Sequence, residues 1–104
     1  MEIKKETRAD WRVVILSGRA DALAAAELEA ALVSAARANS KVAVDLSGVD
    51  YISSAGLRCI LQGAKAAQEC QSEFIVCAPR PGVRKVFDMS GMQNVVKIEA
   101  SLPC

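Results

Sequence analysis

The chain has 104 residues, with 13 basic and 12 acidic side chains, four cysteines and no histidine. This length predicts one domain with a hydrophobic core of its own, and a hydrophobic content of 52% argues against disorder. The absence of histidine excludes Ser/His/Asp and Cys/His nucleophile systems, imidazole metal ligands and phosphohistidine carriers. A formal net charge of +1 gives no broad basic field, so we expect no nucleic-acid partner and no membrane insertion.

The cysteines and the N-terminal residues indicate the compartment. Cys59, Cys70, Cys77 and Cys104 show neither a CxxC motif nor paired zinc-binding spacing. Cys59 and Cys77 lie in apolar stretches, which predicts buried or half-buried free thiols. The opening MEIKKETRADW carries charges where a signal peptide needs an apolar run, and the longest apolar runs are strand-sized. We therefore expect a cytoplasmic protein that uses no cofactor or metal.

The first part of the chain is predicted to form two strands and a helix. Ile3–Thr7 has a weak strand pattern, and Trp11–Ser17 has a much stronger one, apolar and β-branched. Gly18 is expected to end the second strand and open a turn. Asp21 is a suitable N-cap for an alanine-rich helix over Ala22–Ala38. The apolar stripe expected to face the core of this helix is Leu28, Leu32 and Ala35 or Ala36.

The rest of the chain alternates between strands and helices. Lys41–Leu46 is almost continuously apolar, as central parallel strands are. A loop rich in Ser and Gly is expected over residues 47–56, followed by a second helix from about Ala55 to Cys70. The last predicted elements are a strand over Glu73–Cys77, a helix that begins at Pro81 and is ended by Gly91, and a strand over Val95–Glu99.

The predicted order is β-β-α-β-α-β-α-β. Its strict alternation after the opening hairpin indicates an α/β fold, with a mixed β-sheet that has a parallel centre and helices packed against it. No repeat or linker divides the chain, so residues 1–104 are expected to form one domain, with a core at about 3–99 and a short C-terminal tail. The nucleotide-binding patterns GxxxxGK[ST] and GxGxxG are absent, and no acidic pair marks a receiver-type phosphoacceptor site.

The segment Asp50–Leu57 (DYISSAGL) combines two serines with the start of a predicted helix at the end of an apolar strand. Loops at the carboxyl ends of parallel strands commonly carry function. One interpretation is structural, because serine is a favoured helix N-cap. The other is that Ser53 or Ser54 accepts a phosphoryl group, which a helix N-terminus tolerates through its free N–H groups and dipole.

Three segments resemble the STAS domain of bacterial anti-sigma factor antagonists. Asp45–Leu57 (DLSGVDYISSAGL) is similar to the family motif in which a serine before a small residue and Gly-Leu is phosphorylated. Leu16–Asp21 (LSGRAD) and Val86–Met92 (VFDMSGM) resemble a strand-end motif and a late helix-turn motif. The resemblance runs from about Ile3 to Glu99, and counting back from Gly56-Leu57 places the acceptor at Ser54. Many members carry Asp before the acceptor, where this chain has a second serine, so Ser53 stays an alternative.

The resemblance implies a partner-switching regulator of transcription that is not an enzyme and has no catalytic residues. The unphosphorylated form would bind an anti-sigma factor, a serine kinase of the histidine-kinase-like ATPase type, and release its client. Phosphorylation at Ser54 would end the binding, and a PP2C-type phosphatase would reset the cycle. Asp21 would lie close to the acceptor loop, in addition to or instead of capping a helix. The residues expected at the partner interface are Gly18, Asp21, Ser53, Ala55, Gly56, Arg58 and Gln62.

Other functions remain open at this point. A STAS domain can serve without phosphorylation as a subunit of an ABC-type lipid transport complex, or as a stressosome-type scaffold. A serine hydrolase is disfavoured because no base that could activate Ser54 can be identified in the sequence.

Overall fold

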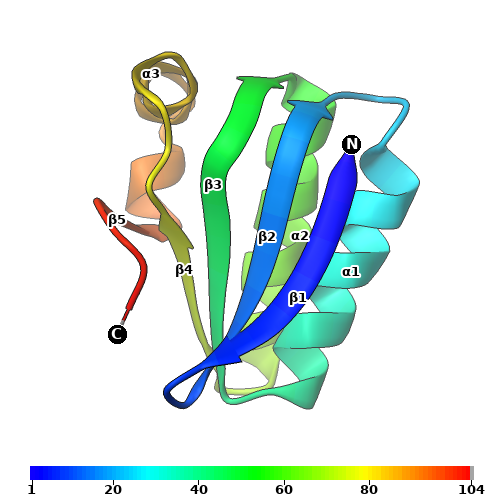
Figure 1. Cartoon of the computed structure of the whole chain (residues 1–104), viewed down its shortest axis with the longest axis vertical. Coiled ribbons are helices and arrows are strands. Elements are labelled where there is room, and N and C mark those ends of the chain that lie inside the picture. The colour runs from blue at the N-terminus through cyan, green and yellow to red at the C-terminus, as the bar shows by residue number, and fades with distance from the viewer. Residues whose placement is uncertain (104) are drawn as a thin grey trace.

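The computed structural model describes residues 1–103, and Figure 1 shows a mixed sheet with helices packed against it. In this part of the chain five strands form one sheet in the order β1-β2-β3-β4-β5. β1 and β2 are antiparallel, and each later neighbour pair is parallel. The strands are β1 (Glu2–Arg8), β2 (Trp11–Ala20), β3 (Lys41–Ile52), β4 (Glu73–Cys77) and β5 (Lys97–Glu99). The predicted α/β fold and element order are confirmed.

The helices connect the parallel strands. α1 and α2 lie side by side behind the sheet in the view of Figure 1, and α3 packs against β3. Gly91 ends α3 in the left-handed conformation, with φ of 79°, which confirms its predicted role as the terminating residue. The helices are α1 (Ala25–Ala38), α2 (Ser54–Glu69), α3 (Pro81–Ser90) and a 3₁₀ turn, η1 (Met92–Asn94).

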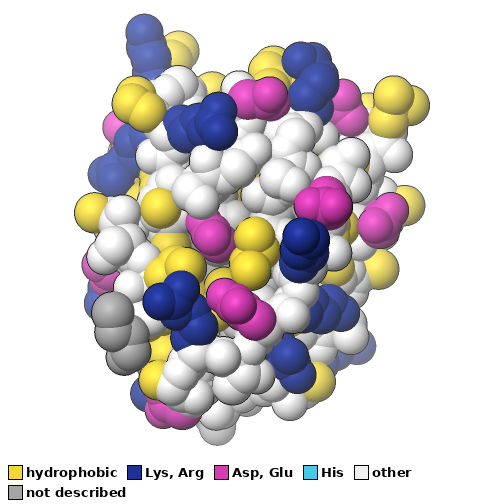
Figure 2. Space-filling view, in the orientation of Figure 1, with side chains coloured by type: hydrophobic (Ala, Val, Ile, Leu, Met, Phe, Trp, Pro, Cys, Tyr) yellow, Lys and Arg dark blue, Asp and Glu magenta, His cyan; other side chains and the backbone are white. Residues whose placement is uncertain are grey.

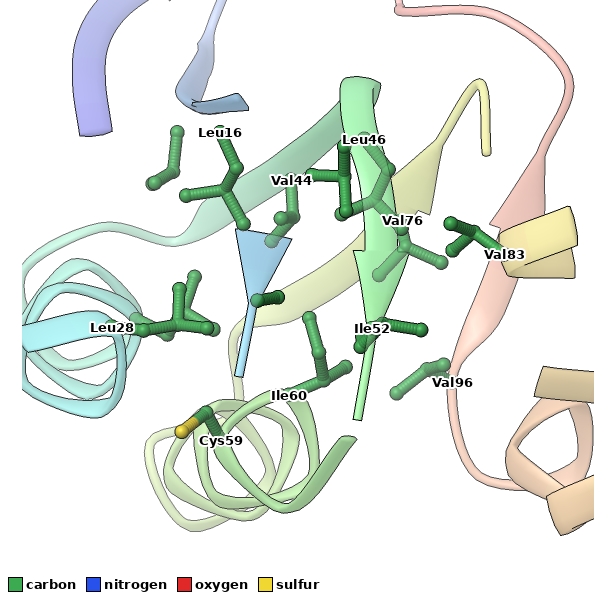
Figure 3. Packing of buried hydrophobic residues seen from close by; sticks show 14 of the residues in the cluster. Leu16, Leu28, Val44, Leu46, Ile52, Cys59, Ile60, Val76, Val83 and Val96 are labelled. Carbon is green, nitrogen blue, oxygen red and sulfur yellow. The ribbon is translucent and has the colours of Figure 1, made fainter. Parts of the chain in front are cut away.

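The main core lies between the sheet and the helices (Figure 3). Leu28 and Leu32 from α1 are fully buried, as the periodicity of that helix predicts, and Ile60 and Phe87 enter the same core from α2 and α3. The sheet supplies β-branched and leucine side chains that alternate along each strand: Val14, Leu16, Val42, Val44, Leu46 and Val76.

The opposite face of the sheet, which faces the viewer in Figure 2, carries a smaller apolar cluster among charged side chains. Val13, Ala43, Ile75 and Cys77 are buried there. Trp11, Ile15 and Leu102 are half-buried and pack over them, so the C-terminal segment folds back onto the sheet. Cys59 and Cys77 are buried free thiols, as predicted, whereas Cys70 is exposed and Cys104 lies outside the described residues.

β2 and β3 run further than the sequence predicts. Gly18 does not end β2: it lies within the strand with φ of 98°, and pairing continues to Ala20. β3 does not end at Leu46 but extends to Ile52, so more than half of the expected Ser/Gly-rich loop is strand. Register shifts in the β2–β3 pairing, after Ile15 and after Gly18, absorb the extra residues as bulges.

The first helix begins later than predicted, and its predicted N-cap is wrong. The N-cap of α1 is Ala24, which makes no side-chain capping bond, and the helix begins at Ala25. Asp21 instead uses Oδ1 to accept the Leu23 N–H at 3.1 Å, which stabilises the turn before the helix. At the other end of the chain the last strand begins at Lys97 and not at Val95, because the N–H groups of Val95 and Val96 donate to the Met92 carbonyl oxygen as the chain leaves η1.

None of the helices within residues 1–103 has the length and apolar character needed to cross a membrane.

Replacing Leu32 by Ala should lower the free energy of unfolding by about 2–5 kcal/mol, because it removes a fully buried side chain and leaves a cavity. Leu23→Ala is the matched control, since Leu23 is 98% exposed and should change stability by less than about 0.5 kcal/mol. Urea unfolding followed by circular dichroism measures both variants. Similar losses in the two would contradict the packing described for α1.

The thiols should differ sharply in reactivity. Burial, with the nearby Asp45 and Glu99 carboxylates, raises the pKa of Cys77 to about 11, and burial also raises the pKa of Cys59. Both thiols are therefore protonated at about pH 8 and shielded from reagent, whereas Cys70 is exposed. Brief iodoacetamide treatment with peptide mapping should label Cys70 in the native protein, and Cys59 and Cys77 only after unfolding. Rapid native labelling of Cys77 would contradict its position.

Candidate functional site

Ser53 joins the start of α2 to the end of β2. As the N-cap of α2, its Oγ accepts the Gly56 N–H at 3.3 Å and donates to the Ala20 carbonyl oxygen at 3.3 Å. The Ser53 backbone N–H donates to the same carbonyl at 2.9 Å. The Ser53 hydroxyl is thus used both as a donor and as an acceptor within the fold.

Gly56 permits this junction because α2 passes very close to β2. A Cβ atom at this position would overlap the Ala20 carbonyl oxygen and lie 2.8 Å from Ile52 Cγ1. Any side chain would therefore push the first turn of α2 away from β2 and stretch the Ser53 hydrogen bonds. Gly56 is buried, and its contribution to the site is to allow this close approach.

Ser54 is the first residue of α2 and differs from its neighbour in both exposure and bonding. Its side chain is exposed, and within residues 1–103 its hydroxyl makes no hydrogen bond, whereas Ser53 is half-buried and engaged. An exposed hydroxyl with no competing partner can enter the active site of another protein without breaking an internal contact. The helix N-terminus around it favours negative charge.

Arg19, Asp21 and Tyr51 form a polar cluster beside the two serines. The Arg19 guanidinium lies 4.2 Å from the centre of the Tyr51 ring, and its Nε is 3.5 Å from Asp21 Oδ2. The β2–β3 register places Arg19 opposite Tyr51, and the next pair is Ala20 and Ile52, which precedes Ser53. Asp21 directly follows Ala20, whose carbonyl oxygen accepts from Ser53, so the Asp21 backbone lies next to the start of α2.

The Arg19–Tyr51 pair is not evident from the sequence. Both residues belong to the motifs that resemble the STAS family, but their pairing depends on β3 continuing beyond Leu46. A Tyr that follows an aspartate in a Gly/Ser-rich segment resembles a loop residue, so only the strand register reveals its partner.

The remaining predicted interface residues are distributed over two elements. Arg58 is exposed one helical turn after Ser54, so the two lie on the same side of α2. Ala55 and Gln62 are half-buried on this helix. Gly18 lies back along β2, opposite Val49, and is separated from Ser53 by Arg19 and Ala20. The structure thus brings Asp21, Ser53, Ser54 and Gly56 together, with Arg58 adjacent and Gly18 and Gln62 further out.

Residues 4–98 match a family model described as "Mlab, STAS domain". The chain belongs to the STAS domain family. Among its relatives, BtrV of Bordetella bronchiseptica, provisionally named an anti-sigma factor antagonist, is 37% identical over 90 residues, covering 86% of this chain and 78% of that protein. The anti-sigma-B factor antagonist of Listeria monocytogenes is 25% identical over 96 residues, covering 91% of this chain and 84% of that protein.

Solved structures share the fold. An anti-sigma factor antagonist from Mycobacterium paratuberculosis is 26% identical with a TM-score of 0.84, covering 97% of this chain and 86% of the other. A provisionally named antagonist from Thermotoga maritima has a TM-score of 0.87 at 18% identity, with 96% and 87% covered. SpoIIAA in its unphosphorylated form has a TM-score of 0.79 at 22% identity, with 96% and 89% covered.

Gly56→Ala should destabilise the protein by roughly 2 kcal/mol or more, because the new methyl group overlaps the Ala20 carbonyl and strains the junction. Gly82→Ala is the matched control: it lies in α3 with no atom within 4 Å of the new Cβ. Because Ala favours a helix over Gly, this control should be neutral or stabilise by up to about 1 kcal/mol. Thermal unfolding compares them, and equal effects would contradict the close approach of α2 and β2.

Proposed function

We propose that this protein is an anti-sigma factor antagonist that works by switching partners. In its unphosphorylated form it binds a cognate anti-sigma factor, a serine kinase of the histidine-kinase-like ATPase type, and so releases the factor's client. Membership of the STAS family and the names of the relatives support this proposal. The protein is a cytoplasmic binding partner on which the kinase acts, and it is not itself an enzyme.

The phosphoryl acceptor in this proposal is Ser54. The contrast between the two serines carries the assignment: Ser53 holds α2 to β2 through its hydroxyl, whereas the exposed Ser54 hydroxyl has no partner within residues 1–103. Transfer forms a bond from Ser54 Oγ to the γ-phosphorus of ATP, releases ADP and loses the hydroxyl proton. The ATP, the metal ion and the base that accepts this proton belong to the kinase.

Phosphorylation ends binding through charge and bulk. A phosphoryl group adds about −1.5 to −2 charges at neutral pH, which reverses the sign of a chain with a formal net charge of +1. It does so in the middle of the proposed contact surface, where Arg58, Ala55 and Gln62 on α2 and Asp21 beside them meet the kinase. Ser53, Gly56 and Gly18 support this surface by shaping the junction between β2 and α2. A PP2C-type phosphatase removes the group and restores binding.

Incubation with ATP and a cognate ATPase-kinase from the gene neighbourhood should add one phosphoryl group at Ser54, detected by mass spectrometry. Ser54→Ala should abolish the modification without loss of stability, because the Ser54 side chain is exposed and makes no hydrogen bond to the described part of the chain. Ser53→Ala should still be phosphorylated but should lose about 1 kcal/mol of stability with its N-cap.

Phosphate on Ser53 would overturn the site assignment. No phosphate on either serine, together with co-purification with an ABC ATPase, would overturn the proposed function in favour of a subunit of a lipid transport complex. Assembly into megadalton particles would instead indicate a stressosome-type scaffold.

A further inference from the structure

β1 is an edge strand of the sheet. One side of β1 is hydrogen-bonded to β2, and no other strand of the described chain pairs with its outer side (Figure 1). It is seven residues long, and each of its side chains except Ile3 is exposed. The opposite edge of the sheet, β5, has only three residues. A long edge strand presents a row of backbone N–H and C=O groups that can pair with another chain.

The charges of β1 alternate in sign along one face of the sheet. Successive side chains on this face are Glu2, Lys4, Glu6 and Arg8, and Ile3 points to the helix side, where it packs against the core. The one ion pair inside this set joins Lys4 Nζ to Glu2 at 3.7 Å, with both side chains about two-thirds exposed. Such an exposed pair contributes little to stability, so its members are free to pair elsewhere.

From this pattern we propose that β1 pairs antiparallel with β1 of a second copy of the chain, about a two-fold axis at Lys5. In that register Glu2 faces Arg8 of the second copy, and Lys4 faces Glu6 of the second copy. Symmetry doubles both, giving four opposite-charge pairs on one face. The result is one sheet that continues through both copies. This inference does not depend on the proposed function.

The two immediately neighbouring registers set like charges against each other. Two-fold pairing places a residue opposite itself, so the neighbouring registers are centred on Lys4 or on Glu6. Centring on Lys4 sets Glu2 against Glu6 and Lys4 against Lys4. Centring on Glu6 sets Lys4 against Arg8 and Glu6 against Glu6. Like charges directly opposite are destabilising, so the same side chains that permit one pairing oppose its neighbours.

The helix side of the edge is compatible with the same axis. A shallow groove beside β1 is lined by Ile3 and Lys5 and, from α1, by Glu27, Ala30 and Ser34. The small side chains of Ala30 and Ser34 keep this groove open. Glu27 and Arg37, which come before and after them on α1, are both exposed. Lys5 meets its own copy on this side, where its long side chain can turn to solvent.

Sedimentation velocity over a concentration series tests the proposal. The unmodified chain should show a concentration-dependent monomer–dimer equilibrium that weakens with salt. Lys4→Glu and Glu6→Lys should each raise the dimer dissociation constant about tenfold or more, because each change creates two like-charge pairs. The double variant Lys4→Glu/Glu6→Lys restores both pairs and should dimerise like the original. A mixture of the two single variants should form the heterodimer, measured by fluorescence anisotropy with one of them labelled.

Lys85→Glu on α3 is the control, since it makes the same charge change at an exposed lysine away from β1 and should leave dimerisation unchanged. Thermal unfolding of each single variant should match the parent at a concentration where all of them are monomeric, which separates lost pairing from lost folding. A chain that stays monomeric at all concentrations would overturn the proposal. So would a dimer that is insensitive to both single changes, or single variants that do not recover when mixed.

Discussion

The carbonyl oxygen of Ala20 joins the end of β2 to the start of α2, beside the proposed acceptor Ser54. It accepts the backbone N–H and the hydroxyl of Ser53, 33 residues later in the chain, and the first turn of α2 passes over it at Gly56. The junction requires β2 to remain extended to Ala20 and β3 to remain paired beside it to Ile52. The bulges near Gly18 and Gly48 make that length possible without breaking the sheet.

This junction separates two chemically identical side chains. The Ser53 hydroxyl donates one hydrogen bond to Ala20 and accepts another from Gly56, so its loss changes how α2 begins. Ser54, one residue later, points to solvent at the same helix terminus and can change its chemistry without changing the fold. A negative charge added there would meet the positive end of the helix dipole, so the fold itself would tolerate the proposed modification.

The sequence predicted much of this architecture because the relevant patterns are local. The element order follows from alternating periodicities, the buried face of α1 from Leu28 and Leu32, and the end of α3 from Gly91. Which of Ser53 and Ser54 caps α2 could not be predicted from residue types, since both can cap a helix and the bond to the distant Ala20 carbonyl involves Ser53. The extension of β3 was missed because its Ser and Gly residues resemble a loop, although they pair across bulges with β2. Asp21 was predicted as a helix N-cap because its carboxylate suits that role. In the structure the same carboxylate stabilises a turn just before α1.

The two proposed surfaces lie on different parts of the sheet, and this bears on whether they influence each other. Ser54 follows the carboxyl end of β3, whereas the β1 edge contributes its own four charges along the side of the sheet. At physiological salt, charges more than about 8 Å apart are largely screened, so the pairing across β1 depends on its directly opposed side chains. Phosphorylation changes the net charge of each copy from +1 to about −1, leaving the magnitude of long-range repulsion between two copies nearly the same. A phosphate that expels a partner from α2 can therefore leave a β1-paired dimer intact, with two switch sites facing opposite ends of one sheet.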